Sequence, residues 1–124
     1  MATLSLRIYL ASGDRLGPGK RQLLQLIDDL GSISAAGRAM KMSYRRAWLL
    51  IEEVNASFGT PLVEKAPGGS GGGGATLTPA GRNVLSCLDE IDAVAGQAAA
   101  KALQQLDALA GPSKVKKKKA AARA

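Results

Sequence analysis

One stretch, GSISAAGRAMKMSYRRAWLLIEEVNASF at residues 31–58, limits what this chain can fold into more than any other. Gly31 suits the end of a preceding helix, where a left-handed residue is common. Ser32 or Ser34 can cap the next helix by accepting an orphan backbone N–H, and Ser43 can cap another helix after a short connection. The stretch therefore predicts two short helices around a tight turn, which is a helix-turn-helix.

The second of these helices is expected from about Tyr44 to Ala56. Its core-facing arc, at 3.6 residues per turn, consists of Ala47, Leu50, Ile51, Val54 and Phe58. Arg45 and Arg46 point away from that arc near the helix start, where a recognition helix contacts base edges. Arginine can donate two hydrogen bonds to guanine O6 and N7. The alternative is an αα-hairpin with two solvated arginines.

The candidate DNA-contacting residues of this motif are Ser34, Arg38, Lys41, Ser43, Tyr44, Arg45, Arg46, Trp48 and Leu49. Tyr44 lies at the border of the buried arc, so it can pack against the neighbouring helix or touch a phosphate or thymine methyl. Packing is favoured for Trp48, one turn later. Leu49 lies opposite the core arc and can contact a thymine methyl, although an isolated exposed leucine is also ordinary.

The formal net charge of +7 is unevenly distributed. Six of the 17 Lys and Arg residues lie near the C-terminus, namely Lys114, Lys116, Lys117, Lys118, Lys119 and Arg123. Residues 1–113 therefore carry eleven basic and ten acidic side chains and are nearly neutral. The high isoelectric point is thus weak evidence for nucleic-acid binding by the folded part. The five lysines are expected to add non-specific DNA affinity, or alternatively to aid solubility alone.

The chain has no histidine, and its single cysteine is Cys87. These counts exclude Ser-His and Cys-His nucleophile pairs, zinc sites built from Cys and His, and an intramolecular disulfide. Cys87 falls in a helical pattern beside Leu85 and Leu88, which favours a buried structural thiol. The ten acids are dispersed without a paired arrangement. We therefore expect no enzyme, no cofactor and no metal site.

The length and hydropathy of the chain are those of a small protein without membrane contact. Its 124 residues suggest one domain with an extension. No run approaches the ~20 apolar residues of a membrane span. The start, MATLSLRIYLASG, lacks the apolar block and cationic flank of a signal peptide. We expect the protein to be cytoplasmic.

The N-terminal part predicts a strand followed by a helix. Apolar and other residues alternate from Leu4 to Leu10, which indicates a half-buried strand. Residues 11–19 carry turn signals, and the period becomes helical from Lys20 to Leu30. The core stripe of this helix is expected at Leu23, Leu26 or Ile27, and Leu30.

Two short strands, at residues 62–65 and 75–77, flank the glycine-rich residues 67–75. A phosphate-binding glycine loop needs a helix directly after it and usually a lysine, which do not follow here. A flexible linker is the compositional alternative. The flanking strands favour a β-hairpin, the wing of a winged helix, whose bare backbone can approach DNA closely. The expected wing residues are Lys65, Gly68, Gly69, Ser70, Gly71, Gly72 and Gly73.

Thr78-Pro79 predicts the start of a last helix, because threonine caps it and proline suits the first position. The helical pattern continues to about Ala110, and Gly111-Pro112 ends it. Such a helix is longer than this small domain needs for its own core. Its many alanines favour close packing against another helix across a dimer. Folding back onto the domain is the alternative.

The motifs that carry a family resemblance are Gly17-Pro18, Leu23-Leu24, GSISAA (31–36), MSYRRAW (42–48), PLVEK (61–65), GGSGGGGA (68–75) and LTPAG (77–81). In this order and spacing, over about residues 15–85, the chain resembles the N-terminal DNA-binding domain of the molybdate-responsive ModE regulators. More distantly, it resembles LysR-type regulators.

The resemblance implies a winged-helix homodimer that binds operator DNA and regulates molybdenum-related genes. It also implies that Ser43, Tyr44, Arg45, Arg46 and Trp48 belong to the recognition helix. Full-length relatives carry a C-terminal oxyanion-binding region of small β-barrels, whereas this chain ends in a helix and lysines. We therefore expect this chain alone not to bind molybdate.

The expected fold is mainly α with a small β component. It comprises a winged helix-turn-helix at residues 1–82, a dimerisation helix at 78–111 and a disordered basic tail at 112–124. The expected function is sequence-specific regulation of transcription on double-stranded DNA. Two alternatives are an architectural DNA-binding protein of low specificity, suggested by the tail, and a dimerising interaction module for another regulator, suggested by the neutral body.

Overall fold

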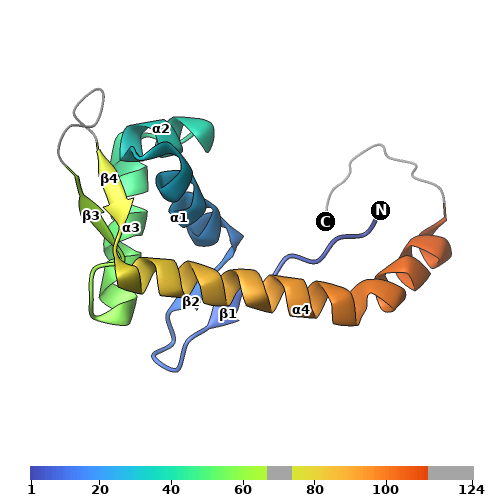
Figure 1. Ribbon diagram of the computed structural model, residues 1–124. Coiled ribbons are helices and arrows are strands. Elements are labelled where there is room, and N and C mark those ends of the chain that lie inside the picture. Colours follow the sequence, from blue (N-terminus) through green and yellow to red (C-terminus); the bar gives the residue numbers. More distant parts are fainter. Residues whose placement is uncertain (67–73, 112–124) are drawn as a thin grey trace. The chain divides into compact units, whose positions relative to one another are not determined.

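The computed structural model describes residues 1–66 and 74–111, in which four helices accompany two pairs of short strands (Figure 1). In chain order these elements are β1 Ile8–Tyr9, β2 Arg15–Leu16, α1 Pro18–Leu30, α2 Ile33–Ala39, α3 Tyr44–Phe58, β3 Val63–Lys65, β4 Ala75–Leu77 and α4 Pro79–Ala110. The predicted fold class, mainly α with a small β component, is therefore confirmed.

The chain divides into two compact units. One is Ser5–Asp92, and the other comprises Met1–Leu4 and the chain from Ala93 on. The first unit contains α1 to α3, both strand pairs and the start of α4. Its hydrophobic core is formed by Leu23, Leu24, Ile27, Ile33, Ala36, Ala47, Ile51, Val54, Leu62, Val63, Ala75, Leu77 and Leu85.

Helix α1 is delimited by residues that suit its two ends. Pro18 lies in the first turn, where its missing N–H leaves no bond unmade. Gly31 ends the helix with a left-handed φ of 68°, and its N–H donates to the carbonyl oxygen of Ile27 at 2.8 Å. The predicted core stripe is wrong at Leu30, which is 49% exposed, because the chain turns at Gly31 and leaves this last turn uncovered.

Helices α2 and α3 form the predicted helix-turn-helix, and a serine caps each of them. The Ser32 hydroxyl accepts the Ala35 N–H at 3.1 Å, so Ser32 rather than Ser34 is the cap of α2. The Ser43 hydroxyl accepts the Arg46 N–H at 3.0 Å. Each cap satisfies an orphan donor and sets where its helix begins.

The turn between α2 and α3 is tightly packed. The Met42 N–H donates to the carbonyl oxygen of Gly37 at 2.9 Å. A Cβ added at Gly37 would lie 3.4 Å from the Met42 oxygen and 3.5 Å from the Cβ of Ala47. The missing side chain at this position therefore lets the two helices approach. Helix α3 continues to Phe58, slightly past its expected end, and stops at Gly59 with a φ of 64°.

The N-terminal strand is much shorter than the sequence predicts. β1 pairs antiparallel with β2, which lies in the segment expected to be a turn. The Leu10 N–H donates to the Asp14 oxygen and the Gly13 N–H donates to the Leu10 oxygen, both at 2.8 Å. This tight turn ends the ladder after one short strand on each side. The alternation is nevertheless correct over residues 5–10, where half-buried and exposed side chains alternate.

The predicted wing is present as an antiparallel pair of strands beside α3 (Figure 1). Val63 of β3 lies opposite Leu77 of β4, and Lys65 lies opposite Ala75. Residues 67–73, which include the glycines expected at the wing tip, lie outside the described residues.

Helix α4 starts as predicted at Thr78-Pro79. The Thr78 hydroxyl accepts the Gly81 N–H at 3.0 Å and donates to the Pro61 oxygen at 2.7 Å. The cap therefore also ties the helix to the segment before β3. No helix in the described part of the chain is long and apolar enough to span a membrane.

Cys87 is exposed, so the expectation of a buried structural thiol is wrong. Leu85 and Leu88 occupy the core-facing side of α4 and are each 6% exposed. Cys87 is rotated by about 100° from Leu88 around the helix axis. It borders an open apolar pocket of about 220 Å³ together with residues of β1, β2 and α3.

Helix α4 and the segment before β3 come into direct backbone contact. A Cβ built on Gly81 would lie 2.1 Å from the carbonyl oxygen of Leu62 and 3.0 Å from its carbonyl carbon. Such separations are far inside van der Waals contact, so any side chain here must push the two segments apart. Gly81 is needed for this close approach.

We expect Gly81→Ala to lower the free energy of unfolding by about 1–3 kcal/mol, the range typical of overpacked sites. Chemical denaturation measures this change. Gly19→Ala in α1 is a matched control, because a Cβ there meets nothing within 4 Å. This control should leave stability unchanged or slightly raised. Equal stability of the two variants would contradict the proposed contact.

Candidate nucleic-acid interface

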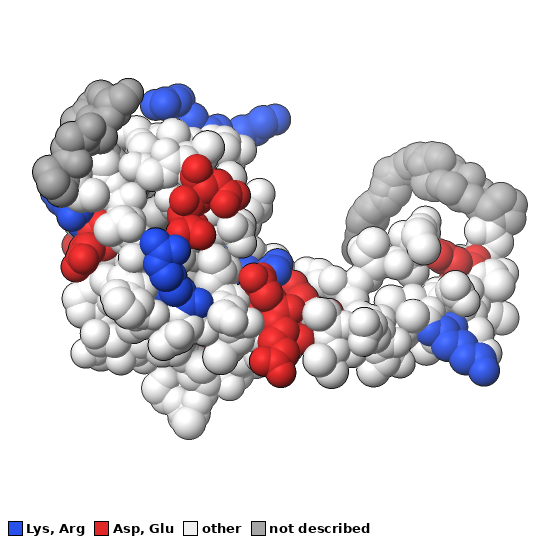
Figure 2. All heavy atoms as spheres, in the orientation of Figure 1, with Lys and Arg blue, Asp and Glu red and all other residues white. Residues whose placement is uncertain are grey.

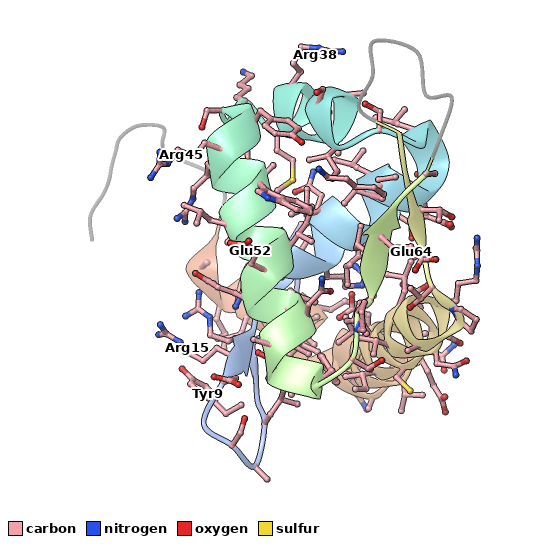
Figure 3. All side chains as sticks on the ribbon, turned by 90° about the vertical axis from the view of Figure 1, so that its left-hand side faces the viewer. Tyr9, Arg15, Arg38, Arg45, Glu52 and Glu64 are labelled. Atoms are coloured by element: carbon pink, nitrogen blue, oxygen red, sulfur yellow. The ribbon has the colours of Figure 1, made fainter. Side chains whose placement is uncertain are left out.

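The start of α3 forms the centre of the candidate interface. Arg45 and Arg46 in its first turn are exposed, and only Tyr44 separates them from the Ser43 cap. That first turn contains no acidic residue, so the positive end of the helix dipole is not neutralised there. Figure 3 shows Arg45 near this end of α3, with Arg38 of α2 beyond it, and Arg15 near the opposite end. Basic side chains and free backbone N–H groups therefore occur together.

Ion pairs neutralise basic residues elsewhere in the unit. In the described part of the chain they join Lys20 to Glu53, Arg21 to Asp89 and Asp92, and Arg82 to Asp28. None of these pairs uses the exposed arginines at the start of α3. Figure 2 shows Lys and Arg side chains at the end of the unit that carries α2, whereas acidic side chains lie among α1 and the first part of α4. On this face the basic side chains near α2 thus lie apart from the acids, whereas those near α1 and α4 lie among them.

Lys41, between α2 and α3, holds a backbone conformation that side chains disfavour. Its φ of 59° is the one positive value at a non-glycine residue in the described ranges 1–66 and 74–111. The Lys41 N–H donates to the Arg38 oxygen at 3.0 Å. The strain is about 1–2 kcal/mol, and glycine would avoid it. Because Lys41 occupies this strained position where glycine would be unstrained, its charged side chain is a candidate for a functional contact.

The structure shows which of the candidate DNA-contacting side chains are buried and which are accessible. Trp48 is half-buried and packs against the core. Tyr44 is 45% exposed, so much of its side chain remains accessible at the start of α3. Leu49 is 42% exposed on the outward face of the same helix, and Ser34 is half-buried on α2.

Trp48 also links the helix-turn-helix to the wing. The Nζ atom of Lys65 lies 5.3 Å from the centroid of the Trp48 ring, within the range of a cation–π interaction. Lys65 is the last residue of β3. The contact therefore holds one predicted wing residue over a predicted residue of the recognition helix. The lysines from 114 to 119 lie outside the described residues.

Asn55 links the wing to α3 by hydrogen bonds, a role that its sequence context does not predict. Its Oδ1 accepts the N–H of Leu62 at 2.7 Å and that of Val63 at 3.4 Å, while its Nδ2 donates to the Val63 oxygen at 3.4 Å. On the other side, the Ala75 N–H donates to the Gly31 oxygen at 3.0 Å. Both wing strands are therefore attached to the helix-turn-helix. The sequence signal was weak, because asparagine is only mildly unfavourable inside a helix.

The described residues offer no sign of a metal centre. Within residues 1–66 and 74–111, no three His, Cys, Asp or Glu side chains come together in a way that could hold an ion. The exposed groups at the start of α3 are hydrogen-bond donors and cations. Their chemistry suits an anionic partner with acceptor groups on its surface.

A helix-turn-helix followed directly by a β-hairpin and a long helix defines a winged helix-turn-helix protein. Residues 21–82 match the sequence model of the bacterial regulatory helix-turn-helix proteins of the lysR family. This match covers half of the chain, and the chain belongs to that family.

Curated relatives match part of this chain, and they confirm the resemblance to ModE regulators. The molybdenum-pterin-binding protein MopB of Rhodobacter capsulatus is 43% identical over 82 residues, which are 66% of this chain and 30% of that protein. The DNA-binding transcriptional dual regulator ModE of Escherichia coli K12 is 42% identical over 72 residues, which are 58% of this chain and 28% of that protein. The chain thus spans less than a third of the length of these relatives.

Solved structures share the fold. The DNA-binding domain of CbnR, in complex with DNA, has a TM-score of 0.57 at 19% identity, over 72% of this chain and 97% of that chain. The LysR family transcriptional regulator VV2_1132 has a TM-score of 0.55 at 21% identity, over 70% of this chain and 29% of that chain. At these identities the likeness establishes the winged helix-turn-helix fold alone.

We expect Lys41→Gly to raise the free energy of unfolding by about 1 kcal/mol, because glycine accepts a positive φ without strain. The same change should weaken DNA binding. If the lost charge met one phosphate, the slope of log K against log salt should flatten by about 0.9. Denaturation and binding titrations over a salt series measure the two effects.

Lys41→Arg is the control for this experiment, since it keeps both the charge and the strained backbone. Its stability and salt slope should stay close to those of the unmodified chain. A glycine variant that is less stable than the unmodified chain would show that the turn stores no strain at this residue.

Proposed function

We propose that this chain is the DNA-reading part of a bacterial transcriptional regulator that recognises a specific operator in duplex DNA. The observation that supports it best is the exposure of Arg45 and Arg46 in the capped first turn of α3. A recognition helix enters the major groove with its N-terminal residues toward the bases. The wing, attached through Asn55 and Gly31, lies beside that helix and can follow the DNA backbone.

The proposal divides the candidate residues by task. Arg45 and Arg46 read base edges, and Leu49 and Tyr44 add contacts to thymine methyl groups or phosphates. The groups expected to position the protein on phosphates are Ser34, Arg38, Lys41, Ser43 and Lys65. The lysines from 114 to 119 add affinity without base preference, because phosphate neutralisation carries no sequence information.

The names of the relatives suggest the physiological setting. MopB is named as a molybdenum-pterin-binding protein, and ModE is named as a DNA-binding transcriptional dual regulator. We therefore propose that the operator controls molybdenum-related genes and that the protein acts in the cytoplasm. We propose no role for this chain in molybdate binding.

We expect replacement of Arg45 or Arg46 by alanine to cost about 1–3 kcal/mol of binding free energy on the operator and to relax preference at one base pair. Each arginine is exposed, so the fold should be unaffected. Arg15→Ala is the matched control, because Arg15 is exposed but lies near the opposite end of α3 (Figure 3). Binding titrations against the operator and single-base variants test this. Unchanged affinity and preference in both alanine variants would overturn the assignment.

Dimerisation through α4 is the second part of the proposal. From Ala93 to Ala110 the helix exposes Val94 (59%), Leu106 (59%) and Leu109 (82%). Most helical stability in proteins comes from packing of an apolar face. A second copy of the chain would cover this face. A two-fold dimer then places the two half-sites about 34 Å apart, or a multiple of that spacing.

We expect the double variant Leu106→Glu, Leu109→Glu to be monomeric, because four carboxylates would be brought into an apolar dimer interface. Sedimentation at micromolar concentration measures the association state. Gln104→Glu is the control, because it adds a charge at an exposed polar position of the same helix and should leave the dimer intact. A double variant that sediments as a dimer would show that the interface lies elsewhere.

A further inference from the structure

Glu52 occupies the outward face of α3, which the proposed function assigns to DNA. Arg45, Leu49 and Glu52 are spaced i, i+4 and i+7, so they lie along one side of the helix. All three are exposed, Leu49 by 42%. Figure 3 shows Glu52 about midway along α3, between Arg45 near its start and Arg15 near its opposite end. The homeodomain recognition helix reads the major groove with residues at this same spacing.

The carboxylate of Glu52 has no ionic partner within the protein's described residues. Its neighbour Glu53 does have one, since its Oε1 lies 3.2 Å from the Nζ of Lys20. No ion pair in the described part of the chain includes Glu52. One turn away on α3, the residues are Trp48, Leu49, Asn55 and Ala56, which carry no charge. Glu53 is thus used in holding α1 to α3, whereas Glu52 presents an unneutralised negative charge.

A negative charge on a DNA-facing surface is repelled by phosphates, so it is favourable there only against a hydrogen-bond donor. In the major groove guanine offers the acceptors O6 and N7, and thymine offers O4 and a methyl group. Adenine has a donor at N6, but its acceptor N7 lies beside it. Cytosine alone presents an amino donor, N4, with no acceptor on its own major-groove edge. We propose that Glu52 reads a cytosine in the operator by accepting a hydrogen bond from N4, an inference that rests on the proposed function.

The helix geometry also sets where this cytosine lies. Seven residues of α-helix rise about 10.5 Å, and stacked bases along one strand are about 3.4 Å apart. With α3 along the groove, the base pair read by Glu52 is therefore about three steps from the one read by Arg45. Leu49 lies between them and meets a pair whose favourable feature is a thymine methyl. Arg45 would thus contact a guanine and Glu52 a cytosine about three base pairs apart within the same half-site.

The test uses the full chain and begins with selection of preferred sites from random duplex DNA. Equilibrium binding to the selected site and its single-base variants is then measured for the unmodified chain, Glu52→Ala and Glu52→Gln. The alanine variant should lose roughly tenfold of its discrimination at one C·G pair and keep the other preferences. The glutamine variant should shift that position toward adenine, because an amide pairs with adenine N6 and N7.

Glu64→Ala is the matched control, since Glu64 is an exposed carboxylate on the wing strand β3. It should change affinity for all sequences by a similar factor and alter no base preference. The Glu52 proposal is overturned if both Glu52 variants behave in that same uniform way, or if the affected position is the one that Arg45→Ala relaxes. It is also overturned, together with the proposed function, if the unmodified chain selects no sequence. Selection of a clear site with unchanged preferences in both Glu52 variants would overturn the Glu52 proposal alone.

Discussion

The relative placement of α3, the wing and the start of α4 depends on the contacts of Leu62. Its side chain is fully buried, its N–H donates to Asn55 of α3 at 2.7 Å, and its carbonyl oxygen accepts the Thr78 N–H at 2.9 Å. Gly81 of α4 approaches the same carbonyl so closely that it has no room for a Cβ. The recognition helix, the base of the wing and the start of α4 therefore meet at one residue. A displacement there would move all three elements together, which couples the placement of the wing to that of the helix.

The parts of the fold that could be predicted are those decided by local rules. Gly31, Ser43 and Thr78 mark helix ends in the sequence because a left-handed residue or a capping hydroxyl acts on backbone groups within a few residues. The errors concern burial and strand length, which depend on distant neighbours. Leu30 and Cys87 both lie at positions where the local helical pattern predicts burial. Whether another element covers them depends on distant parts of the chain, and both are exposed.

The same distinction applies to the candidate site. Arg45 and Arg46 can be assigned to the first turn of α3 from the capping serine alone, and the structure leaves both exposed. Asn55 could not be assigned, because its partners become neighbours only after the chain has left α3 and turned into β3. The strain at Lys41 is also invisible in the sequence, since lysine at a helix connection is ordinary and only its φ of 59° sets it apart.

Net charge alone misrepresents this protein, because its first 113 residues are nearly neutral. Four of the ten acids, Asp28, Glu53, Asp89 and Asp92, form ion pairs that join α1 to α3 and α4. The arginines at the start of α3 take part in none of the ion pairs among the described residues. Lys65 of β3 forms no such pair either, and its Nζ lies over the Trp48 ring. The exposed arginines at the start of α3 therefore remain available to an anionic partner. Under the proposed function, these arginines draw the protein toward the phosphates before any base is met. Glu52, about midway along α3, then bears on which sequence is bound.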